Sequence, residues 1–149
     1  MTELSHPPAE AGRRSGSSSA RFSPAASIAD RMVRLIHHYT GRGPTTARTT
    51  LNTNIVVVAF HDTLTKGEQN LVAAGQSDAV HAMRRIFHDV MGPEAVATVR
   101  EVLNREVVSF LSDIDPRSNV AAMVFVLEPR PETGRVQVAD SPDVASDET

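Results

Sequence analysis

The sequence predicts an α+β domain whose elements follow the order helix, hairpin, two or three helices, hairpin. Two unbroken apolar runs carry this prediction, Ile55 to Phe60 and Val120 to Leu127. Both are rich in valine and too short for ordinary helices, so they indicate buried strands. Apolar stripes at helical spacing precede and separate them. We therefore expect a four-stranded, mainly antiparallel sheet built from two hairpins.

Composition favours one domain. The chain has 149 residues, of which 40% are hydrophobic, enough for a substantial core. Because it has no cysteine, disulfides and thiolate chemistry are excluded. It has neither a long apolar stretch typical of a membrane span nor an N-terminal apolar signal segment, so we expect a cytoplasmic protein.

Both ends of the chain differ in composition from its middle. Residues 1–25 are rich in Pro, Gly and Ser, and residues 129–149 combine prolines with an acidic excess, so both predict disordered tails around a domain at 26–128. Residues 1–48 contain seven arginines and three acidic residues, a charge of +4. These arginines are dispersed, and with one lysine, one tyrosine and no tryptophan we expect no nucleic-acid binding.

The first helix is predicted from an apolar stripe with Ser27 as its N-cap and Gly41 at its end. The stripe comprises Ile28, Met32, Leu35, Ile36 and Tyr39. Thr46 to Leu51 is β-prone but polar, which predicts an edge strand. The turn signal Asn52-Thr53-Asn54 joins it to the buried strand at Ile55 to Phe60.

Helical signals follow the central strand. Thr65 and Glu68 have the spacing of a capping box, which predicts a short helix from Lys66 to Ala74, closed by Gly75. A second helical pattern starts at Ser77 and reaches Asn104, interrupted at Gly92-Pro93, so we expect either a kink or two abutting helices. Its expected core positions are Val80, Met83, Phe87, Val90 and Met91.

The last two strands are predicted at Glu106 to Ser112 and Val120 to Glu128. The second of these and the central strand are apolar on both sides, so both faces of the sheet should be covered. The long helix can cover one face. Either the first helix or a second subunit must cover the other, which motivates a homodimer hypothesis.

Few residues suggest chemistry. His61-Asp62, at the end of the central strand, is a candidate acid–base pair, although strand alternation points the two side chains apart. Gly41 to Pro44 offers Arg42 and the backbone of Gly43 to a small anion, or it is simply a helix stop. The histidines lack metal-ligand spacing, because His81 and His88 lie two helical turns apart. We expect no metal and no cofactor.

Three motifs in order resemble the MpsC-like family, formerly a domain of unknown function. They are Gly41 to Pro44 (GRGP), Asp62 to Glu68 (DTLTKGE) and Phe110 to Pro116 (FLSDIDP), within a match over roughly Ile28 to Glu128. The family is associated with a sodium-translocating, membrane-potential-generating system. The resemblance implies a small accessory protein beside membrane subunits linked to cation and inorganic-carbon uptake, with no established catalytic residues.

Three functions therefore stand as hypotheses. The favoured one is a non-enzymatic accessory or regulatory protein, dimeric and peripheral at the inner face of the membrane through its transporter subunits. The alternative is a cytosolic sensor of a small anion or nucleotide, with Arg42, Gly43, Asp62, Arg84 and Arg85 as ligand-binding candidates. The third is a small hydrolase or lyase using His61 and Asp62.

Overall fold

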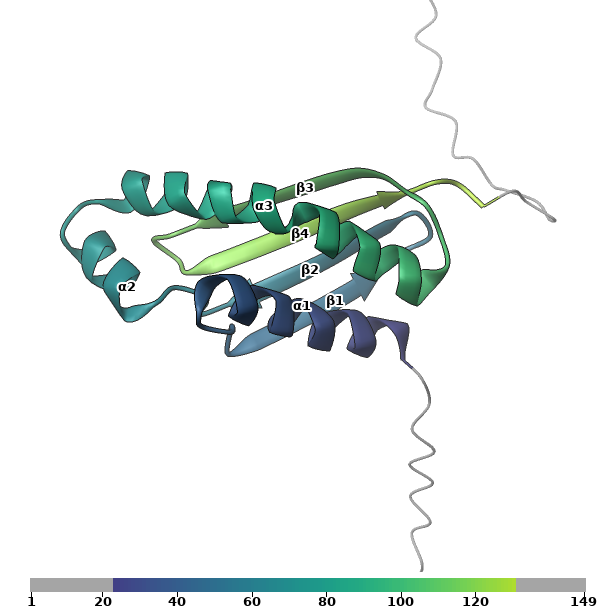
Figure 1. The fold of residues 1–149 in the computed structure, drawn as a ribbon, viewed down its shortest axis with the longest axis horizontal. Coiled ribbons are helices and arrows are strands. Elements are labelled where there is room, and N and C mark those ends of the chain that lie inside the picture. The colour runs from purple at the N-terminus through teal and green to yellow at the C-terminus, as the bar shows by residue number, and fades with distance from the viewer. Residues whose placement is uncertain (1–22, 131–149) are drawn as a thin grey trace, which may run out of the picture.

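The computed structural model describes residues 23–130 and confirms the α+β class (Figure 1). The tails predicted at 1–25 and 129–149 fall almost wholly outside these residues. Three helices and four strands form the described part. In chain order they are α1 (Pro24–Thr40), β1 (Thr46–Leu51), β2 (Ile55–His61), α2 (Lys66–Ala73), α3 (Ser77–Leu103), β3 (Val107–Asp115) and β4 (Val120–Leu127).

The sheet has the strand order β1-β2-β4-β3, and every pairing is antiparallel. Each hairpin contributes one edge strand and one central strand, so the apolar strands β2 and β4 lie side by side in the middle. Strand β3 continues through Asp115, three residues beyond its predicted end. Those three residues pair with the start of β4, which is why a segment expected to be a loop is extended.

Helices α1 and α3 lie on the same face of the sheet, α1 against β1 and α3 against β3, and they also contact each other (Figure 1). The alternative in which the first helix covers the opposite face is therefore wrong. Alternation along β2 and β4 sends the largest apolar side chains toward the helices, and two helices are needed to bury them. The opposite face of the sheet carries no element among residues 23–130.

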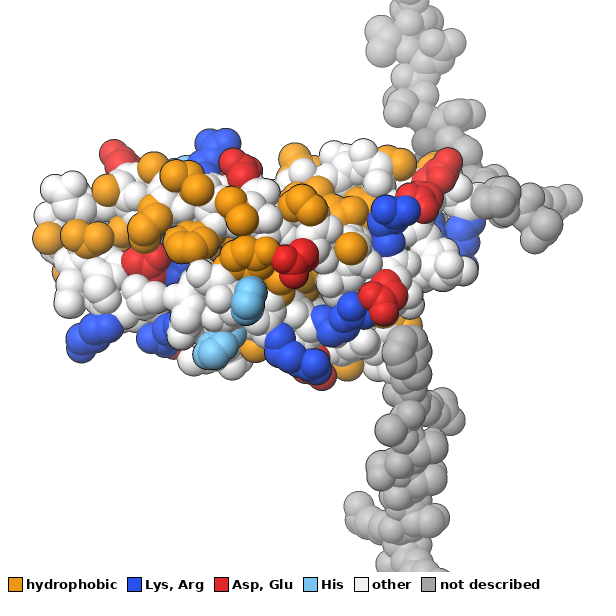
Figure 2. All heavy atoms as spheres, in the orientation of Figure 1, with side chains coloured by type: hydrophobic (Ala, Val, Ile, Leu, Met, Phe, Trp, Pro, Cys, Tyr) orange, Lys and Arg blue, Asp and Glu red, His pale blue; other side chains and the backbone are white. Residues whose placement is uncertain are grey.

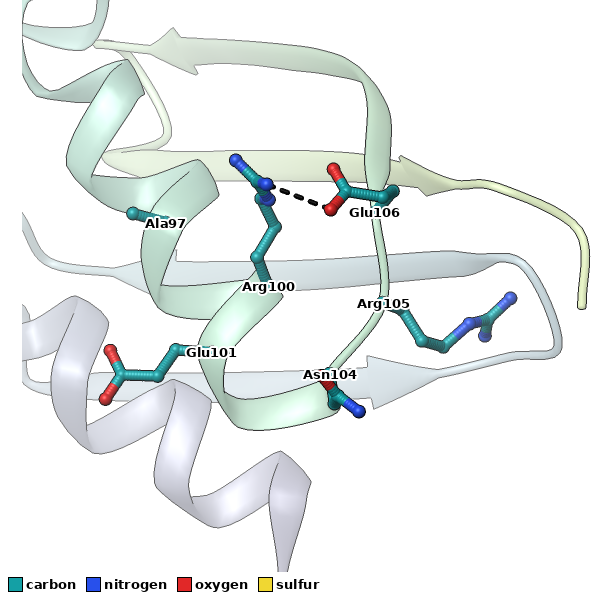
Figure 3. Close-up of a pocket in the computed structure, with 6 residues that line it drawn as sticks. All are labelled: Ala97, Arg100, Glu101, Asn104, Arg105 and Glu106. Carbon is teal, nitrogen blue, oxygen red and sulfur yellow. Dashed lines mark hydrogen bonds and ion pairs between the residues drawn. The ribbon is translucent and has the colours of Figure 1, made fainter.

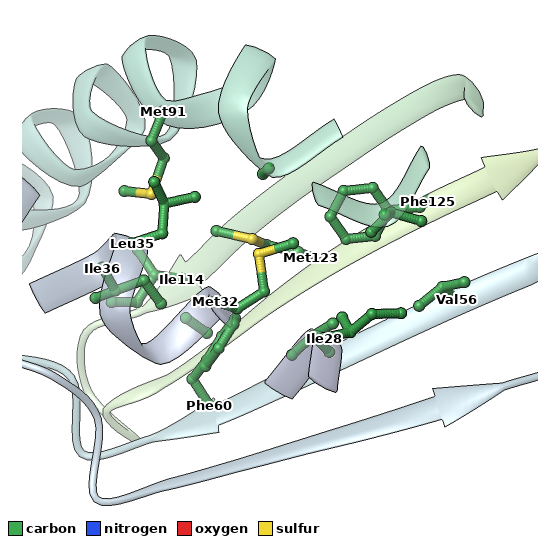
Figure 4. Packing of buried hydrophobic residues seen from close by; sticks show 14 of the residues in the cluster. Ile28, Met32, Leu35, Ile36, Val56, Phe60, Met91, Ile114, Met123 and Phe125 are labelled. Carbon is green, nitrogen blue, oxygen red and sulfur yellow. The ribbon is translucent and has the colours of Figure 1, made fainter. Parts of the chain in front are cut away.

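The core lies between the helices and the sheet (Figure 4). Met32 of α1, Met91 of α3 and the central-strand residues Phe60 and Met123 all belong to this core and are almost fully buried. Phe110 and Phe125 pack with ring centroids 5.0 Å apart across β3 and β4. The core thus joins both hairpins to both long helices, and it fixes the loops at the strand ends.

Helix α1 begins earlier than predicted. Its N-cap is Ser23, whose hydroxyl accepts a hydrogen bond from the backbone of Ala26, and Pro24 occupies the first helical turn. Ser27 instead lies inside the helix, where its backbone N–H donates to the carbonyl of Ser23. The predicted cap at Ser27 is therefore wrong, because Pro24, with its fixed φ, suits the first turn of a helix.

Helix α3 is continuous through Pro93, so of the two predicted alternatives, a kink or two abutting helices, the second is wrong. Pro93 removes one backbone hydrogen bond. Packing holds the helix together here, since Gly92 lies against the ring of Phe110, where an added Cβ would be only 3.2 Å from a ring carbon. Met83 and Val90 were expected in the core but are exposed, and Arg84 and His88 are buried instead.

Candidate functional site

Two of the three sequence motifs, GRGP and DTLTKGE, meet at one end of the sheet, where β2 ends and β4 begins. We call this site the loop cluster; it consists of Arg42, residues 62–68, Arg84 and Asn119. Two of its residues, Asp62 (φ 58°) and Asn119 (φ 55°), have left-handed backbones, which Asp and Asn tolerate better than most residues. Each stands at the end of a central strand, so both strands turn sharply there.

Asn119 anchors the loop that follows β2. Its side-chain oxygen accepts hydrogen bonds from the backbone N–H groups of Thr63 (2.9 Å) and Leu64 (3.0 Å). Its side-chain nitrogen donates to the Asp62 carboxylate at 3.2 Å, and its carbonyl accepts from the Asp62 N–H at 2.9 Å. One side chain therefore satisfies two backbone donors that the end of a strand would otherwise leave unpaired.

Asp62 also pairs with Arg42, whose Nη2 donates to Oδ2 at 2.8 Å. Both side chains are partly open to water, at 35% and 40% exposure. Arg42 follows Gly41, which ends α1 in a left-handed conformation with its N–H bonded to the carbonyl of His37. The pair therefore ties the end of α1 to the end of β2.

Arg84 forms the second ion pair, which is buried. Its Nε and Nη2 donate to the two carboxylate oxygens of Glu68 at 2.9 and 2.6 Å, a bidentate contact, and Nη2 also donates to the carbonyl of Thr63 at 2.7 Å. Side-chain exposures are 1% for Arg84 and 6% for Glu68. Helix α3 thus holds the loop at residues 62–68 through the buried side chain of Arg84.

The predicted capping box is confirmed and shares this carboxylate. Glu68 accepts from the backbone N–H of Thr65 at 2.7 Å, while the Thr65 hydroxyl accepts from the N–H of Glu68 at 3.2 Å. Burial would raise the pKa of Glu68, but the hydrogen bonds from Arg84 and Thr65 outweigh it, and the pKa lies below its ordinary value. Glu68 is thus ionised at neutral pH and serves the cap and the ion pair together.

His88 lies one turn beyond Arg84 on the buried face of α3, and its Nδ1 is hydrogen-bonded to the hydroxyl of Ser112. Burial, followed by the nearby positive charge of Arg84, lowers its pKa below the ordinary value. The ring is therefore neutral at pH 7. His88, Ser112 and Arg85 border a shallow hollow of about 260 Å³.

The sequence-predicted ligand candidates do not form one site. Arg42 and Asp62 are brought together, whereas Arg84 is turned inward and held by Glu68. Gly43 packs beside Val33 of α1. Arg85 is exposed on α3, next to the hollow with His88 rather than in the loop cluster. Whether any of them binds a ligand stays a prediction.

The proposed acid–base pair also separates. Asp62 lies between Arg42 and Asn119, while His61 is exposed at the last position of β2 and pairs in register with Thr46 and Val120. Within residues 23–130, no group of three His, Asp or Glu side chains has the geometry to hold a metal ion. The described histidines occupy several different elements.

A second polar hollow, of about 380 Å³, lies at the opposite end of the sheet (Figure 3). There Arg100 pairs with Glu106 at 2.9 Å. Arg105 donates to the carbonyls of Thr53 and Glu128 and so joins the first hairpin to the end of β4. These contacts stabilise the fold at the protein surface, and the Arg100–Glu106 ion pair is open to water.

Helix α3 presents an apolar surface on its outer side, which we call the outer stripe. It comprises Ala79, Met83, Ile86 and Val90, all exposed. Ile86 is 65% and Val90 57% exposed, and Leu71 of α2 adds a further exposed apolar side chain. Figure 2 shows hydrophobic side chains running over this part of the molecule. Large apolar residues are thus concentrated where a solvated helix normally carries polar ones.

Comparison with known families assigns the chain. A family model described as Na+-translocating membrane potential-generating system (MpsC) matches residues 23–129. The chain belongs to the MpsC family. No curated protein and no solved structure gives a significant match to it. The match covers all seven helices and strands of the described structure. Between residues 23 and 130, no helix is long and apolar enough to cross a membrane.

Sequence reasoning missed three features of this MpsC protein. Asn119 is not among the predicted site residues, although an Asn just before a buried strand is a signal for a left-handed position. The burial of Arg84 and His88 was missed because Met83 and Val90 fit the apolar pattern better. The same error concealed the outer stripe, which a helical-wheel comparison of the two faces would have revealed as a second apolar face.

Proposed function

We propose that this MpsC protein is a non-enzymatic accessory subunit that binds peripherally to a membrane subunit of the Na+-translocating system in its family's description. The outer stripe of α3 carries this proposal. The family description supplies the membrane system, and the stripe supplies a surface by which a chain with no spanning helix among residues 23–130 can attach to it.

The N-terminal half of α3 buries two polar side chains and exposes three large apolar ones. Arg84 and His88 face the interior, while Met83, Ile86 and Val90 face outward. Exposing several large apolar side chains in a row is unfavourable in water unless a partner covers them. Their exposure on the free chain is therefore best explained by a binding role.

The spacing of the outer stripe indicates a helical partner. Ala79, Met83, Ile86 and Val90 follow intervals of four, three and four residues, the pattern by which one helix packs along another. An amphipathic or interfacial helix of a membrane subunit has the matching apolar face. The stripe would bind that helix along about 17 Å, the eleven rises of about 1.5 Å that separate Ala79 from Val90.

The polar groups of the loop cluster support a non-enzymatic role. The Glu68 carboxylate is held by Arg84 and by the Thr65 N–H, and the Asp62 carboxylate by Arg42 and Asn119. Groups so engaged stabilise the loop against α1 and α3. A general base or nucleophile needs instead a group within reach of substrate and with a pKa near the working pH.

A small-anion or nucleotide sensor is the second candidate, and one observation favours it. The Arg42 guanidinium is 35% exposed and lies between two glycines, where an anion can approach the backbone. Thermal-shift measurements with bicarbonate, phosphate and nucleotides separate the candidates. An accessory subunit gives no shift, while a sensor gives a shift that Arg42→Met removes.

Membrane association tests the favoured proposal. The tagged full chain is expressed in its native cell, and its share in the membrane fraction is compared with that of an Ile86→Asp, Val90→Asp double variant. Val108→Asp is the matched control, because Val108 is 61% exposed but lies on β3, outside the stripe. Circular dichroism checks that all variants fold.

We expect the chain and the Val108→Asp control to sediment with the membranes and to capture a membrane subunit. The stripe variant should remain folded but stay in the soluble fraction. Equal sedimentation of the stripe variant would contradict the stripe as the docking surface. Failure of the unmodified chain to sediment with membranes that hold its transporter would sink the accessory role.

A further inference from the structure

The face of the sheet turned away from the helices is apolar in its centre. On β2 the outward residues are Ile55, Val57 and Ala59, and they alternate with the buried Val56, Val58 and Phe60. On β4 the outward residues are Val120, Ala122, Val124 and Val126. We call this surface the open face. It is built of small and β-branched side chains, the kind that pack sheet against sheet about 10 Å apart.

The pairing registers place opposite charges on its two edges. Arg48 of β1 pairs with Ala59, Ala59 with Ala122, and Ala122 with Asp113 of β3. The backbones of these four residues therefore form one row across the sheet, with Arg48 at one edge and Asp113 at the other, where the Asp113 carboxylate lies at the rim of the open face and reaches the ring of His81 on α3. The neighbouring row toward the loop cluster also ends on an acid, Asp115, and begins with Thr46.

We propose that a second copy of this chain covers the open face, related by a two-fold axis that runs parallel to the strands between β2 and β4. This axis places β1 of one copy over β3 of the other. Each row of residues across the sheet then faces the same row of the second copy, in the reverse direction. Arg48 of each copy then lies over Asp113 of its partner, twice by symmetry. The inference stands independently of the proposed membrane role.

The charge pattern selects this axis. A two-fold axis perpendicular to the strands also brings the two open faces together, but it places β1 over β1 and β3 over β3. Arg48 then approaches its own copy, and the acidic edges approach each other, which is repulsive. Of these two axes, the one parallel to the strands pairs the basic edge with the acidic edge while burying the same apolar centre.

Asp113 remains able to take part. One carboxylate oxygen already accepts from the ring of His81 at 2.7 Å and from the N–H of Ile114 at 2.9 Å. Its side chain is nevertheless 69% exposed, and both of these hydrogen bonds use Oδ1 alone. Arg48 is exposed as well. The cross-copy pair serves mainly to orient the two sheets, and apolar burial provides most of the attraction.

The size of the open face predicts a dimer that dissociates on dilution. Four strands about 4.8 Å apart and seven residues of about 3.3 Å give a footprint on the order of 450 Å² per copy. The pair then totals about 900 Å², just under the roughly 1,000 Å² expected of a specific interface. Sedimentation should therefore show monomer and dimer exchanging as the concentration changes.

Cross-linking between introduced cysteines tests the axis, and the chain has none of its own to interfere. Differently tagged Arg48→Cys and Asp113→Cys chains are mixed and treated with a short bismaleimide. The proposed axis puts these two positions opposite each other, so a mixed product forms. The same axis separates the two copies of position 48 by about 14 Å across the strands, in addition to the about 10 Å between the sheets. Arg48→Cys chains alone should therefore not cross-link to each other. Arg85→Cys with Asp113→Cys is the control.

Sedimentation of Val124→Asp gives a second readout. This change places a charge at the centre of the open face and should convert the dimer to monomer, whereas Ile86→Asp on the outer stripe should leave it unchanged. Self-linking of Arg48→Cys, or no link between folded Arg48→Cys and Asp113→Cys chains, would overturn the proposed axis. A chain that stays monomeric at every concentration would overturn the dimer itself.

Discussion

Two arginine–carboxylate pairs hold the same loop, residues 62–68, and they differ chiefly in their contact with water. Arg84 and Glu68 are buried and joined by two hydrogen bonds, whereas Arg42 and Asp62 are joined by one and are more than a third exposed. When a buried charge loses its partner, no water can take the partner's place, whereas water solvates an exposed charge that loses its partner. The two pairs thus look alike in a contact list but should differ greatly in importance.

The comparison separates scaffold from surface. Arg84, one of the ligand-binding candidates predicted from the sequence, is placed where it stabilises the fold and holds the Glu68 carboxylate of the α2 capping box. Arg42 is placed where a substitution changes the surface and little else. A set of variants can test this division, beginning with the change expected to cost most.

Replacing Arg84 with Met should cost about 3–5 kcal/mol of unfolding free energy, because it leaves the Glu68 carboxylate buried without its partner. Chemical denaturation measures this loss. Arg85→Met is the matched control, since Arg85 is the next residue but is exposed, and it should change stability by no more than about 0.5 kcal/mol. Equal losses for the two variants would contradict the burial argument.

Asn119→Ala should cost about 2–3 kcal/mol, because it leaves the backbone N–H groups of Thr63 and Leu64 without their acceptor. Asn104→Ala is a suitable control. Asn104 also has a left-handed backbone, with φ 51°, so both variants lose the same conformational preference. A loss for Asn119→Ala no larger than for Asn104→Ala would show that the anchoring bonds contribute little.

His88 should make the fold sensitive to mild acid. Its pKa is lowered in the folded state, so the unfolded chain binds a proton first as the pH falls below about 6.5. Stability should therefore be full above that pH and decline as the pH falls from about 6.5 toward the lower folded pKa. Denaturation at several pH values should show this decline, and His88→Gln should flatten it. An unchanged profile in His88→Gln would assign the decline to other groups.

Arg42→Met should cost less than about 1 kcal/mol, the usual range for an exposed ion pair. Raising the salt concentration should weaken the Arg42–Asp62 pair further but leave the Arg84–Glu68 pair almost unaffected. Denaturation at low and high salt measures both effects. A loss for Arg42→Met as large as for Arg84→Met would remove the distinction between the two pairs.

The elements that local chemistry determines were predictable from the sequence. Gly41 ends α1, and the capping box at Thr65 and Glu68 opens α2, because each depends on residues a few positions apart. The partners of Glu68 and Thr63 were not predictable. Arg84 and Asn119 reach them across 16 and 56 residues, and only the packing of α3 and the pairing of β2 with β4 bring them together.

The covering of the sheet shows the same limit. Apolar residues on both sides of β2 and β4 predicted that both faces would be covered; helices cover one face, and a cover for the other stays a prediction. Which helices lie there depends on how α1 and α3 fit over the large side chains of Phe60, Met123 and Phe125, a property of the assembled core. The sequence pattern therefore left open whether the second face is covered by a helix or by another subunit.

The double variant Arg84→Met, Glu68→Leu tests most directly whether the buried ion pair serves the fold alone. Replacing a buried ion pair by apolar residues of similar size is often tolerated, so we expect a folded chain. If the pair serves only the scaffold, membrane association of this variant should equal that of the unmodified chain. The double variant could instead fold, with native circular dichroism, yet no longer sediment with membranes. That result would contradict a purely structural role, because the ion pair would then take part in the function itself.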